Sequence, residues 1–535
     1  MTKQLSDILL GVGHATDHDV RGVTIRAVTA DSRKVEPGSL FICIVGLAAD
    51  GHAYVEAAAA KGAAAIVANH DHRHNLSSVH GLPVIWVEDS RKAMGDIAAA
   101  FYDHPAAGLI LVGLTGTNGK TTTSFILEAI IRAAGGNPGV IGTVNYRYGG
   151  REFPAPFTTP EPLELQRLLR EMADDGVTHV IMEVSSHALA QHRIQGLLFD
   201  AALFTNLTRD HLDFHHTMEA YYQAKKRLFV DYLKDTGAAV VMVAGLEDGE
   251  DSDWGRRLYD DVRAARFGRA GTLLACGLTS EGCDVSASDP VFRCGETAVS
   301  VQTARGRIEV LSNLVGRFNL KNIVGAVGVA EGLGLDLAAV GRALRQTIRV
   351  PGRLEAITVA ANLPLPAVFV DYAHTPDALE NVLTTLRQLG PQRLLVVFGC
   401  GGDRDPGKRP LMGEIAGRLA DVVIITADNS RSESTADIMA AIERGVAMAG
   451  MGRLGAETGG RGYAALASRD GAIAEAIGRA GTGDIVLISG KGHETYQITN
   501  DGVQFFDDRL EAAKCLKVKA ERQKSEAGCQ ASFGS

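Results

Sequence analysis

The sequence predicts an α/β protein of three domains, and three observations lead to this prediction. The chain has 535 residues, whereas a single hydrophobic core rarely grows beyond about 250–300 residues. Continuous apolar runs alternate with helical stretches, a pattern typical of parallel sheets covered by helices. Breaks interrupt this pattern at residues 101–105 and at the Pro351-Gly352 turn. We therefore expect domains over residues 1–106, 107–349 and 350–535.

The first and third domains are predicted from their apolar runs. In the first domain, residues 39–45 and 64–68 predict strands and residues 54–61 predict a helix. The third domain has four strand-like runs separated by helical stretches, which predicts a Rossmann-like sheet; these runs are residues 367–370, 394–398, 422–426 and 485–489. The polar tail from about residue 523 is expected to fray.

The middle domain is predicted to be doubly wound. It opens with the apolar strand 109–114, a glycine-rich turn and a helix over residues 122–134. Apolar runs at residues 180–184 and 201–204 predict further strands, with the helical stretch 163–172 before them. This βαβ alternation predicts a parallel sheet with helices on both faces.

Composition excludes several classes of function. The net charge is -9, from 54 basic and 63 acidic residues, so nucleic acid is not expected as a partner. No apolar run reaches the roughly 18–20 residues of a membrane helix, so no membrane partner is expected. The seven cysteines form no Cys-x-x-Cys pair, which argues against a disulfide framework and a cysteine-rich zinc site. We expect a cytoplasmic protein.

The turn after the strand 109–114 has the character of a phosphate-binding loop. It reads Thr-Gly-Thr-Asn-Gly-Lys-Thr-Thr over residues 115–122. Glycines let backbone N–H groups surround phosphate oxygens at a helix N-terminus. Lys120 can reach the outer phosphates, and the Thr121 hydroxyl can bind Mg²⁺. Leu114 stands where the strict motif has glycine, but the strand–loop–helix context favours phosphate binding over a plain glycine turn.

Two polar residues follow successive predicted strands of the middle domain. Glu183 ends the run 180–184, and His211 follows the run 201–204. Strand carboxyl ends face the ligand crevice of an open α/β sheet, so both side chains are predicted near Lys120. Carboxylate suits Mg²⁺, and imidazole is an acceptable minority ligand. Either residue alone would read as a helix cap; together they predict a metal site.

The helical stretch 221–229 carries two adjacent lysines. Its periodicity predicts that Lys225 and Lys226 lie on a solvent-exposed face. The pattern assigns Lys225 no chemical role.

Motifs along nearly the whole chain resemble the Mur ligase family. The shared motifs are Thr-Gly-Thr-Asn-Gly-Lys-Thr at 115–121, Glu-Val-Ser-Ser-His at 183–187, Arg-Asp-His-Leu-Asp at 209–213, Ala-Lys at 224–225, Gly-Arg-Phe-Asn-Leu-Lys-Asn at 316–322, Pro-Gly-Arg at 351–353 and Asp-Tyr-Ala-His-Thr-Pro at 371–376. Others resemble members that add the third stem-peptide residue: Asp-Ser-Arg at 31–33, Asp-Gly-His at 50–52, Thr-Thr-Pro-Glu at 158–161, Gly-Gly-Asp-Arg-Asp at 401–405, Asp-Asn-Ser-Arg at 428–431 and Ser-Gly-Lys-Gly-His-Glu at 489–494.

The resemblance implies an ATP-dependent amide ligase of peptidoglycan precursor synthesis, and hence of cell-wall biogenesis, cell shape and cell division. It implies that meso-2,6-diaminopimelate is joined to the D-glutamyl γ-carboxylate of UDP-N-acetylmuramoyl-L-alanyl-D-glutamate through an acyl phosphate. It also implies a UDP-binding N-terminal domain, a central P-loop ATPase-like domain and a C-terminal Rossmann-like domain that binds the amino acid. The partners are these small molecules, and we expect a monomer.

The resemblance further assigns roles to individual residues. Ser32, Thr158, Thr159, Ser185, Gln191 and Arg193 would bind the UDP-muramoyl dipeptide. ATP would be bound by Gly116, Thr117, Asn118, Gly119, Lys120, Thr121, Thr122, Asn319, Arg353, Asp371 and His374. Mg²⁺ would be held by Thr121, Glu183 and His211, and Lys225 would be carbamylated, so that Lys120, Lys225, Glu183 and His211 carry catalysis. The amino acid would be bound by Arg404, Asp428, Asn429, Ser430, Arg431, Gly490 and Glu494.

The chain departs from the family pattern at three places. Ser430 replaces the usual proline, Leu47-Ala48 replaces His-Gln of some members, and residues 243–248 lack the family's Asn-x-Asp-Asp. Arg431, a bidentate fork suited to a distal carboxylate, favours diaminopimelate over L-lysine, unless it only pairs with Glu433. A folylpolyglutamate synthetase-like ligase and a P-loop switch protein are the alternatives. A guanine-reading Asn-Lys-x-Asp motif is absent from the sequence.

Overall fold

A computed structural model of the protein describes residues 1–46, 49–74, 76, 81–243, 253–293, 295–360, 363–455 and 460–533. The predictions for Leu47-Ala48 and most of the segment 243–248 fall outside these residues. The chain divides into two compact units. The first comprises Met1–Ser286, Thr303–Gly306 and Val324–Ala343, and the second comprises Ala287–Gln302, Arg307–Ile323 and Leu344–Ser535.

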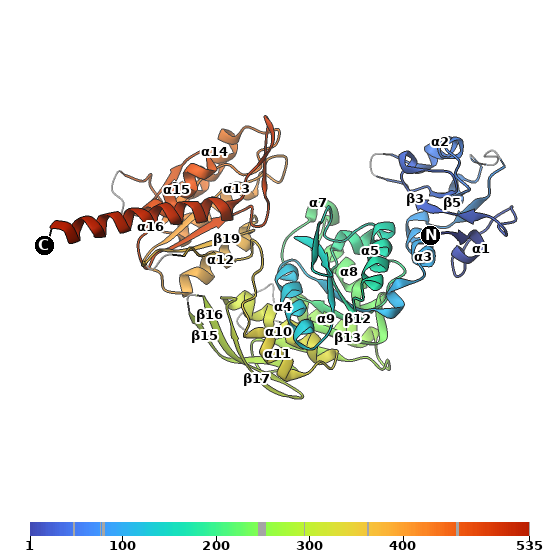
Figure 1. The fold of residues 1–535 in the computed structure, drawn as a ribbon, viewed down its shortest axis with the longest axis horizontal. Coiled ribbons are helices and arrows are strands. Elements are labelled where there is room, and N and C mark those ends of the chain that lie inside the picture. The colour runs from blue at the N-terminus through green and yellow to red at the C-terminus, as the bar shows by residue number, and fades with distance from the viewer. Residues whose placement is uncertain are drawn as a thin grey trace. The chain divides into compact units, whose positions relative to one another are not determined.

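The N-terminal part of the first unit is a small parallel sheet, in the order β3-β4-β5-β6 (Figure 1). Its strands are β3 (Ala27–Thr29), β4 (Ser39–Ile42), β5 (Ala65–Asn69) and β6 (Val84–Val87), beside the short pair β1 (Lys3–Gln4) and β2 (Thr24–Ile25). Its helices are α1 (Leu5–Ile8), α2 (Val55–Ala60) and α3 (Ser90–Phe101). The predicted strands and helix are confirmed within a few residues at their ends.

Helix α3 packs closely against the loop 195–196 of the middle part. A Cβ atom on Gly95 would come within 2.5 Å of the Gln195 carbonyl oxygen, so only glycine fits without rearrangement. The Gln195 amide also donates a 3.1 Å hydrogen bond to Asp96. This contact attaches the N-terminal sheet to a loop that follows Gln191 and Arg193.

The middle part of the first unit is built on a mostly parallel sheet. Eight strands that lie wholly within the unit follow the order β10-β9-β8-β11-β7-β12-β13-β14. They are β7 (Ile110–Thr115), β8 (Pro138–Ile141), β9 (Asn145–Tyr148), β10 (Arg151–Pro154), β11 (His179–Glu183), β12 (Phe199–Phe204), β13 (Leu233–Met242) and β14 (Leu273–Gly277). Strands β11 and β12 flank β7, so their carboxyl ends lie at the same sheet edge as the phosphate loop.

Helices cover this sheet and bury its apolar faces. They are α4 (Lys120–Ala133), α5 (Pro162–Asp174), α6 (Ser186–Ala190), α7 (Leu212–His215), α8 (Met218–Val230), α9 (Asp253–Ala265), α10 (Arg317–Gly332) and α11 (Leu337–Leu344), the last two crossing the division between units. Tyr221, Leu228 and Phe229 of α8 are each no more than 1% exposed and belong to the core of this part.

The second unit contains a six-stranded sheet in the order β18-β19-β23-β20-β21-β22, parallel except for its edge strand β18. Its strands are β18 (Glu355–Ile357), β19 (Ala367–Asp371), β20 (Leu394–Phe398), β21 (Val422–Ile425), β22 (Gly462–Ala465) and β23 (Ile485–Ser489). The hairpin β24 (Tyr496–Thr499) and β25 (Gly502–Phe505) follows, and β15 (Val285–Arg293), β16 (Glu296–Thr303) and β17 (Gly306–Ser312) lie largely in this unit.

The helices of this sheet are α12 (Pro376–Gln388), α13 (Lys408–Leu419), α14 (Thr435–Met448), α15 (Arg469–Arg479) and α16 (Asp508–Phe533) (Figure 1). The predicted Rossmann-like domain is thereby confirmed. The tail from about residue 523, for which fraying is expected, is the last part of α16, which continues as a helix to Phe533. Within the described parts of the chain, no helix is both long and apolar enough to cross a membrane.

Candidate active site

The loop between β7 and α4 has the backbone shape that phosphate binding requires. Gly116 and Gly119 have positive φ angles of 147° and 88°, a region that disfavours other residues. A Cβ atom on Gly116 would lie 1.9 Å from the Thr205 hydroxyl oxygen. The loop is fixed from the neighbouring strand end, since the Thr117 N–H donates to the Asn206 carbonyl and the Asn118 N–H to its side chain.

Two lysines converge on this loop. The Lys120 ammonium folds back and donates 2.8 Å hydrogen bonds to the carbonyl oxygens of Gly116 and Thr117. The Lys225 ammonium, from α8, donates a 2.8 Å bond to the same Gly116 oxygen. Both cations therefore lie at the loop that would hold the phosphates.

Lys225 is buried, which overturns the prediction that it lies on a solvent-exposed face. It is 1% exposed, and its ammonium lies 4.5 Å from the centre of the Tyr221 ring. The prediction was wrong because α8 packs against the loop along the face that carries Lys225, whereas Lys226 forms an ion pair with Asp261. Burial lowers the pKa of Lys225 well below its usual range, and Lys120 lowers it further against the opposing effect of Asp210.

The Glu183 carboxylate lies at the end of β11 and is held on both oxygens. The Thr121 hydroxyl donates to Oε2 at 3.0 Å, and the Thr143 hydroxyl donates to the same oxygen at 2.8 Å. The Thr143 N–H donates to Oε1 at 3.1 Å. A Cβ atom on Gly142 would lie 2.4 Å from Oε1, so the Gly142-Thr143 pair is shaped around this carboxylate. The structure thus brings the predicted ligands Thr121 and Glu183 together.

His211 lies at the start of α7, within a group of rings. Its imidazole meets the His187 ring edge-on at 4.9 Å, and His187 also lies 5.6 Å from the His215 ring. Burial lowers the pKa of His211 despite Asp210, and Lys120 and Lys225 lower it further. A neutral imidazole at neutral pH has a lone pair available for a metal ion.

The residues predicted for the muramoyl dipeptide form one hydrogen-bonded group. The Thr159 hydroxyl donates to the Glu183 carbonyl at 2.8 Å and accepts from the Ser185 N–H at 3.1 Å. Arg193 donates to the Thr159 carbonyl at 3.0 Å and to the Gln191 side chain. The Thr158 hydroxyl lies 3.1 Å from that of Thr143. Ser32 lies apart from this group, in the short helix Ser32–Lys34 of the N-terminal sheet.

The predicted amino-acid-binding residues come together in the second unit, except that the Arg404 side chain is exposed. The Asn429 amide donates to the Glu494 carboxylate at 3.0 Å, and a Cβ atom on Gly490 would lie 3.0 Å from an oxygen of Asp428. Ser430 is buried, and its carbonyl packs against Gly402, so the residue that replaces proline is well packed. Arg404 is exposed on the adjacent loop.

Arg431 faces the loop 401–404 and does not pair with Glu433. Its guanidinium donates a 2.6 Å bond to the Gly402 carbonyl, and its N–H donates to the Ile498 carbonyl at 3.2 Å. Glu433 is instead held by both terminal nitrogens of Arg409. The alternative that Arg431 only forms a surface ion pair with Glu433 is therefore wrong.

A buried ion pair holds the two loops that carry the predicted amino-acid-binding residues Asp428 and Gly490. The Arg469 guanidinium makes two 2.7 Å bonds to Asp508, the first residue of α16, and both side chains are fully buried. Arg469 also donates to the carbonyls of Ala427 and Ser489, which directly precede Asp428 and Gly490.

Four residues predicted near the nucleotide belong to the second unit, whereas the phosphate loop belongs to the first. The buried Asp371 accepts backbone hydrogen bonds from Leu354 and Ala373, and Asn319 donates to the Val315 carbonyl. The Arg353 guanidinium lies 4.6 Å from the centre of the Tyr372 ring, and the His374 ring lies at a similar distance.

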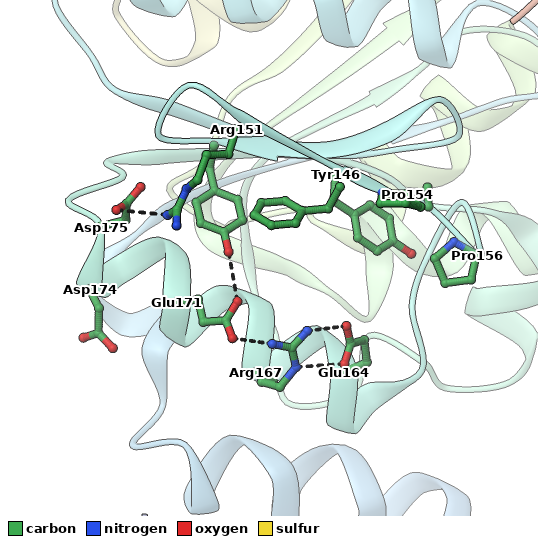
Figure 2. A pocket seen from close by; sticks show the side chains of 12 residues that line it. Tyr146, Arg151, Pro154, Pro156, Glu164, Arg167, Glu171, Asp174 and Asp175 are labelled. Carbon is green, nitrogen blue, oxygen red and sulfur yellow. Dashed lines mark hydrogen bonds and ion pairs between the residues drawn. The ribbon is translucent and has the colours of Figure 1, made fainter.

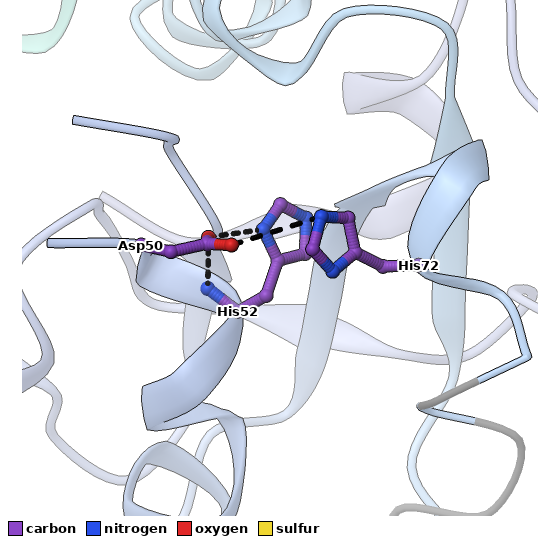
Figure 3. Close-up of side chains that lie close together, drawn as sticks. All are labelled: Asp50, His52 and His72. Carbon is purple, nitrogen blue, oxygen red and sulfur yellow. Dashed lines mark hydrogen bonds and ion pairs between the residues drawn. The ribbon is translucent and has the colours of Figure 1, made fainter. Parts of the chain in front are cut away.

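Asp50, His52 and His72 form a cluster that resembles a metal site in spacing only (Figure 3). The His52 Nδ1 atom lies 2.6 Å from Asp50, and its Nε2 atom accepts the Asn69 N–H at 3.1 Å. The proton must therefore be on Nδ1, and His52 has no free lone pair for a metal ion. With His52 engaged, only Asp50 and His72 remain, so the cluster is a structural hydrogen-bond group.

A cavity of about 960 Å³ lies between the β9–β10 hairpin and α5 (Figure 2). Arg167 pairs there with Glu164 and Glu171, and Arg151 pairs with Asp175. The residues predicted to bind substrates do not line it, and each of its two arginines is paired with carboxylates of the same cavity.

Two residues that the motifs did not assign lie in contact with predicted site residues. Thr143 connects Glu183 with Thr158, and Lys491 contacts Asp428 and Asn429. In the sequence, Thr143 is marked only by the Gly-Thr pair after β8, and Lys491 only by the Gly-Lys-Gly run after β23. Neither pattern has a spacing that identifies the residue to which the side chain is hydrogen-bonded.

Comparison with known proteins gives matches over most of the chain. The family models that match are described as "Mur ligase family, catalytic domain" over residues 24–102, "Mur ligase middle domain" over residues 114–330 and "Mur ligase, glutamate ligase domain" over residues 352–492. The UDP-N-acetylmuramoyl-L-alanyl-D-glutamate–2,6-diaminopimelate ligase of Geobacter metallireducens is 44% identical over 503 residues, covering 92% of this chain and 94% of that protein.

Solved structures agree with these matches. A structure described as UDP-N-acetylmuramoyl-L-alanyl-D-glutamate–2,6-diaminopimelate ligase has a TM-score of 0.69 and 32% identity, covering 97% of this chain and 99% of its own. The folylpolyglutamate synthase of Mycobacterium tuberculosis, complexed with ADP and AMPPCP, has a TM-score of 0.59 at 17% identity over 75% of this chain and 92% of its own. The second likeness concerns the fold alone.

Proposed function

The chain belongs to the Mur ligase family, ATP-dependent ligases that form a carbon–nitrogen bond in peptidoglycan synthesis, and we propose that its acceptor is meso-2,6-diaminopimelate. The bond would join this amino acid to the D-glutamyl γ-carboxylate of UDP-N-acetylmuramoyl-L-alanyl-D-glutamate. Family membership excludes the P-loop switch. The observation that carries the choice of acceptor is Arg431, aimed at the loop 401–404 beside Asn429 and Glu494 rather than at Glu433.

The remaining assignments are part of the same proposal. Domains over residues 1–106, 107–349 and 350–535 would bind the UDP-muramoyl end, ATP and the amino acid. The enzyme would act as a monomer in the cytoplasm. The hydrogen-bonded group of Thr159, Ser185 and Arg193 supports a role in seating the dipeptide close to Glu183.

Magnesium fits the donors around Glu183. The site offers a buried carboxylate with the Thr121 hydroxyl 3.0 Å away, and oxygen donors are what Mg²⁺ prefers. His211, whose imidazole is neutral at neutral pH, is the third ligand of the proposal. Bound there, Mg²⁺ would neutralise charge on the ATP phosphates. Thr143 would keep the carboxylate oriented when Thr121 turns to the metal.

Carbamylation of Lys225 is supported by its burial next to Lys120. The free amine adds to CO₂, which forms an N–C bond, releases a proton and turns a cation into an anion. A lowered pKa supplies the free amine that this step needs. The anion would also relieve the repulsion between two cations at Gly116.

The reaction would proceed in two steps. The γ-carboxylate attacks the γ-phosphorus of ATP, giving an acyl phosphate and ADP, and Lys120 holds the phosphates in position. The amine of the amino acid then attacks the acyl carbon and phosphate leaves. Since water would hydrolyse the acyl phosphate, the reacting groups must be enclosed.

The test measures phosphate released from ATP with the muramoyl dipeptide and the amino acid, singly and together. Release is expected only when both are present, and faster with meso-diaminopimelate than with an equal concentration of L-lysine. Equal or faster release with L-lysine would contradict the proposed acceptor.

A further inference from the structure

Lys491 is a fully buried cation at the centre of the residues predicted to bind the amino acid. It follows β23 and Gly490, and its side chain has no exposed surface. Its ammonium donates to the Asn429 side-chain oxygen at 2.9 Å and to the Tyr496 carbonyl at 2.8 Å. It lies 3.4 Å from the Asp428 carboxylate and 4.0 Å from that of Glu494. An ammonium has three protons, so these neighbours engage it fully.

The first effect of Lys491 is on the direction of the Asn429 amide. The amide oxygen accepts both the Lys491 ammonium and the Ile498 N–H, at 2.9 and 3.0 Å. Two donors on this oxygen leave the amide nitrogen facing Glu494, to which it donates at 3.0 Å. Reversing the amide would place its N–H groups against two donors, so Lys491 fixes the orientation of Asn429 and, through it, of Glu494.

The second effect is electrostatic. Asp428 and Glu494 are carboxylates on neighbouring loops, and Asp428 raises the pKa of Glu494 in addition to burial. Arg469 lowers the pKa of Asp428 and Lys491 lowers it further, both against burial. The Lys491 ammonium lies within 4.0 Å of both acidic groups, whereas the Arg469 guanidinium is hydrogen-bonded to Asp508.

We propose that Lys491 is a positioning residue for the acceptor amino acid: it orients Asn429 and Glu494 and sets the charge of their site. The proposal rests on the assignment of this group to amino-acid binding. Its charge favours a net-neutral diacid over a net-cationic amino acid, because a site without Lys491 would be more negative by one charge. Lys491 does not contact the amino acid itself, since its three protons are engaged.

The test compares wild type with Lys491→Met and Lys491→Gln in full-length enzyme, with Lys514→Met, an exposed lysine of α16, as the matched control. KM for each of the three substrates, kcat and the melting temperature are measured with meso-diaminopimelate and with L-lysine. We expect KM for meso-diaminopimelate to rise about tenfold or more, while KM for ATP and for the muramoyl dipeptide stay within about twofold. The ratio of kcat/KM for meso-diaminopimelate over L-lysine is expected to fall.

Other outcomes overturn the proposal. An unchanged KM for the amino acid, an equal rise of all three KM values, or an unchanged preference ratio would each show a structural role only. If the Met variant is unstable, Lys491→Gln, which keeps a hydrogen-bond donor without the charge, shows whether Lys491 positions the amino-acid site or only stabilises the fold. If the wild type prefers L-lysine, the proposed acceptor is contradicted, but the role of Lys491 is still tested. The change in KM for the amino acid, compared with KM for ATP and for the muramoyl dipeptide, is then measured with L-lysine.

Discussion

Lys120 and Lys225 donate hydrogen bonds to a single acceptor, the carbonyl oxygen of Gly116, each at 2.8 Å. Two ammonium groups on one oxygen repel each other, and the repulsion contributes to the lowered pKa of Lys225. Phosphate oxygens at the loop and an anionic Lys225 would each relieve it. Nucleotide binding and carbamylation of Lys225 would therefore relieve the same repulsion between the Lys120 and Lys225 ammonium groups.

Replacing Lys120 with alanine is expected to abolish ligation, because the phosphates lose their fixed positive charge. The loss should exceed about a hundredfold in kcat/KM, the scale seen when one donor to a developing charge is removed. Phosphate release is the measurement. Arg132→Ala, an exposed residue at the end of the same helix, should retain wild-type turnover. Normal turnover in the Lys120 variant would contradict the ATP-site assignment.

Lys225→Ala is expected to be inactive and to recover part of its activity with a short carboxylate such as acetate. Acetate supplies the anion that the carbamate would provide. Lys226→Ala is the matched control on the same helix, since Lys226 pairs with Asp261 and is partly exposed. Full activity of the Lys225 variant without acetate would contradict carbamylation.

Carbamate should form on Lys225 at a lower pH than on an exposed lysine. CO₂ adds only to the neutral amine, and a lowered pKa increases the neutral fraction at every pH below the usual value. A carbamate carbon signal from ¹³CO₂ should therefore be seen near neutral pH in wild type and disappear in Lys225→Ala. The same signal in both proteins would place the carbamate elsewhere.

Arg431→Ala is expected to weaken the use of meso-diaminopimelate selectively. A charge-assisted hydrogen bond contributes about 2 kcal/mol, so kcat/KM for the diacid should fall about thirtyfold. L-lysine, which lacks the distal carboxylate, should be little affected in a competition assay. Arg418→Ala, an exposed arginine paired with Glu380, serves as the control. Parallel losses for both amino acids would show that Arg431 does not discriminate between them.

Thr143→Val is expected to weaken metal binding without unfolding the protein. Valine matches threonine in shape but cannot donate to Glu183, so the carboxylate loses one of its two hydroxyl donors. The Mn²⁺ affinity, measured by electron paramagnetic resonance without turnover, should fall several-fold, and Thr143→Ser should restore it. An unchanged affinity in the Val variant would contradict this role.

Parts of the site that depend on strand direction could be predicted from the sequence. Glu183 and the phosphate loop share a sheet edge because each follows a parallel strand that its apolar run predicted, although only the structure shows that β11 lies beside β7. The burial of Lys225 could not be predicted, because periodicity reports one helix and not the loop that packs against it. The roles of Thr143 and Lys491 were equally hidden, since hydrogen bonds between segments about 40 and 60 residues apart leave no spacing to recognise.

The buried pair of Arg469 and Asp508 anchors the first residue of the last helix, so the two ends of this helix differ in their tolerance to shortening. Asp508 neutralises the guanidinium that holds the carbonyls before Asp428 and Gly490, so its removal would leave an uncompensated charge beneath the amino-acid site. Packing of the helix extends to Ala520. A stop codon or a fusion tag placed after residue 523 should thus leave acceptor binding intact, whereas a chain that ends before Asp508 should lose it.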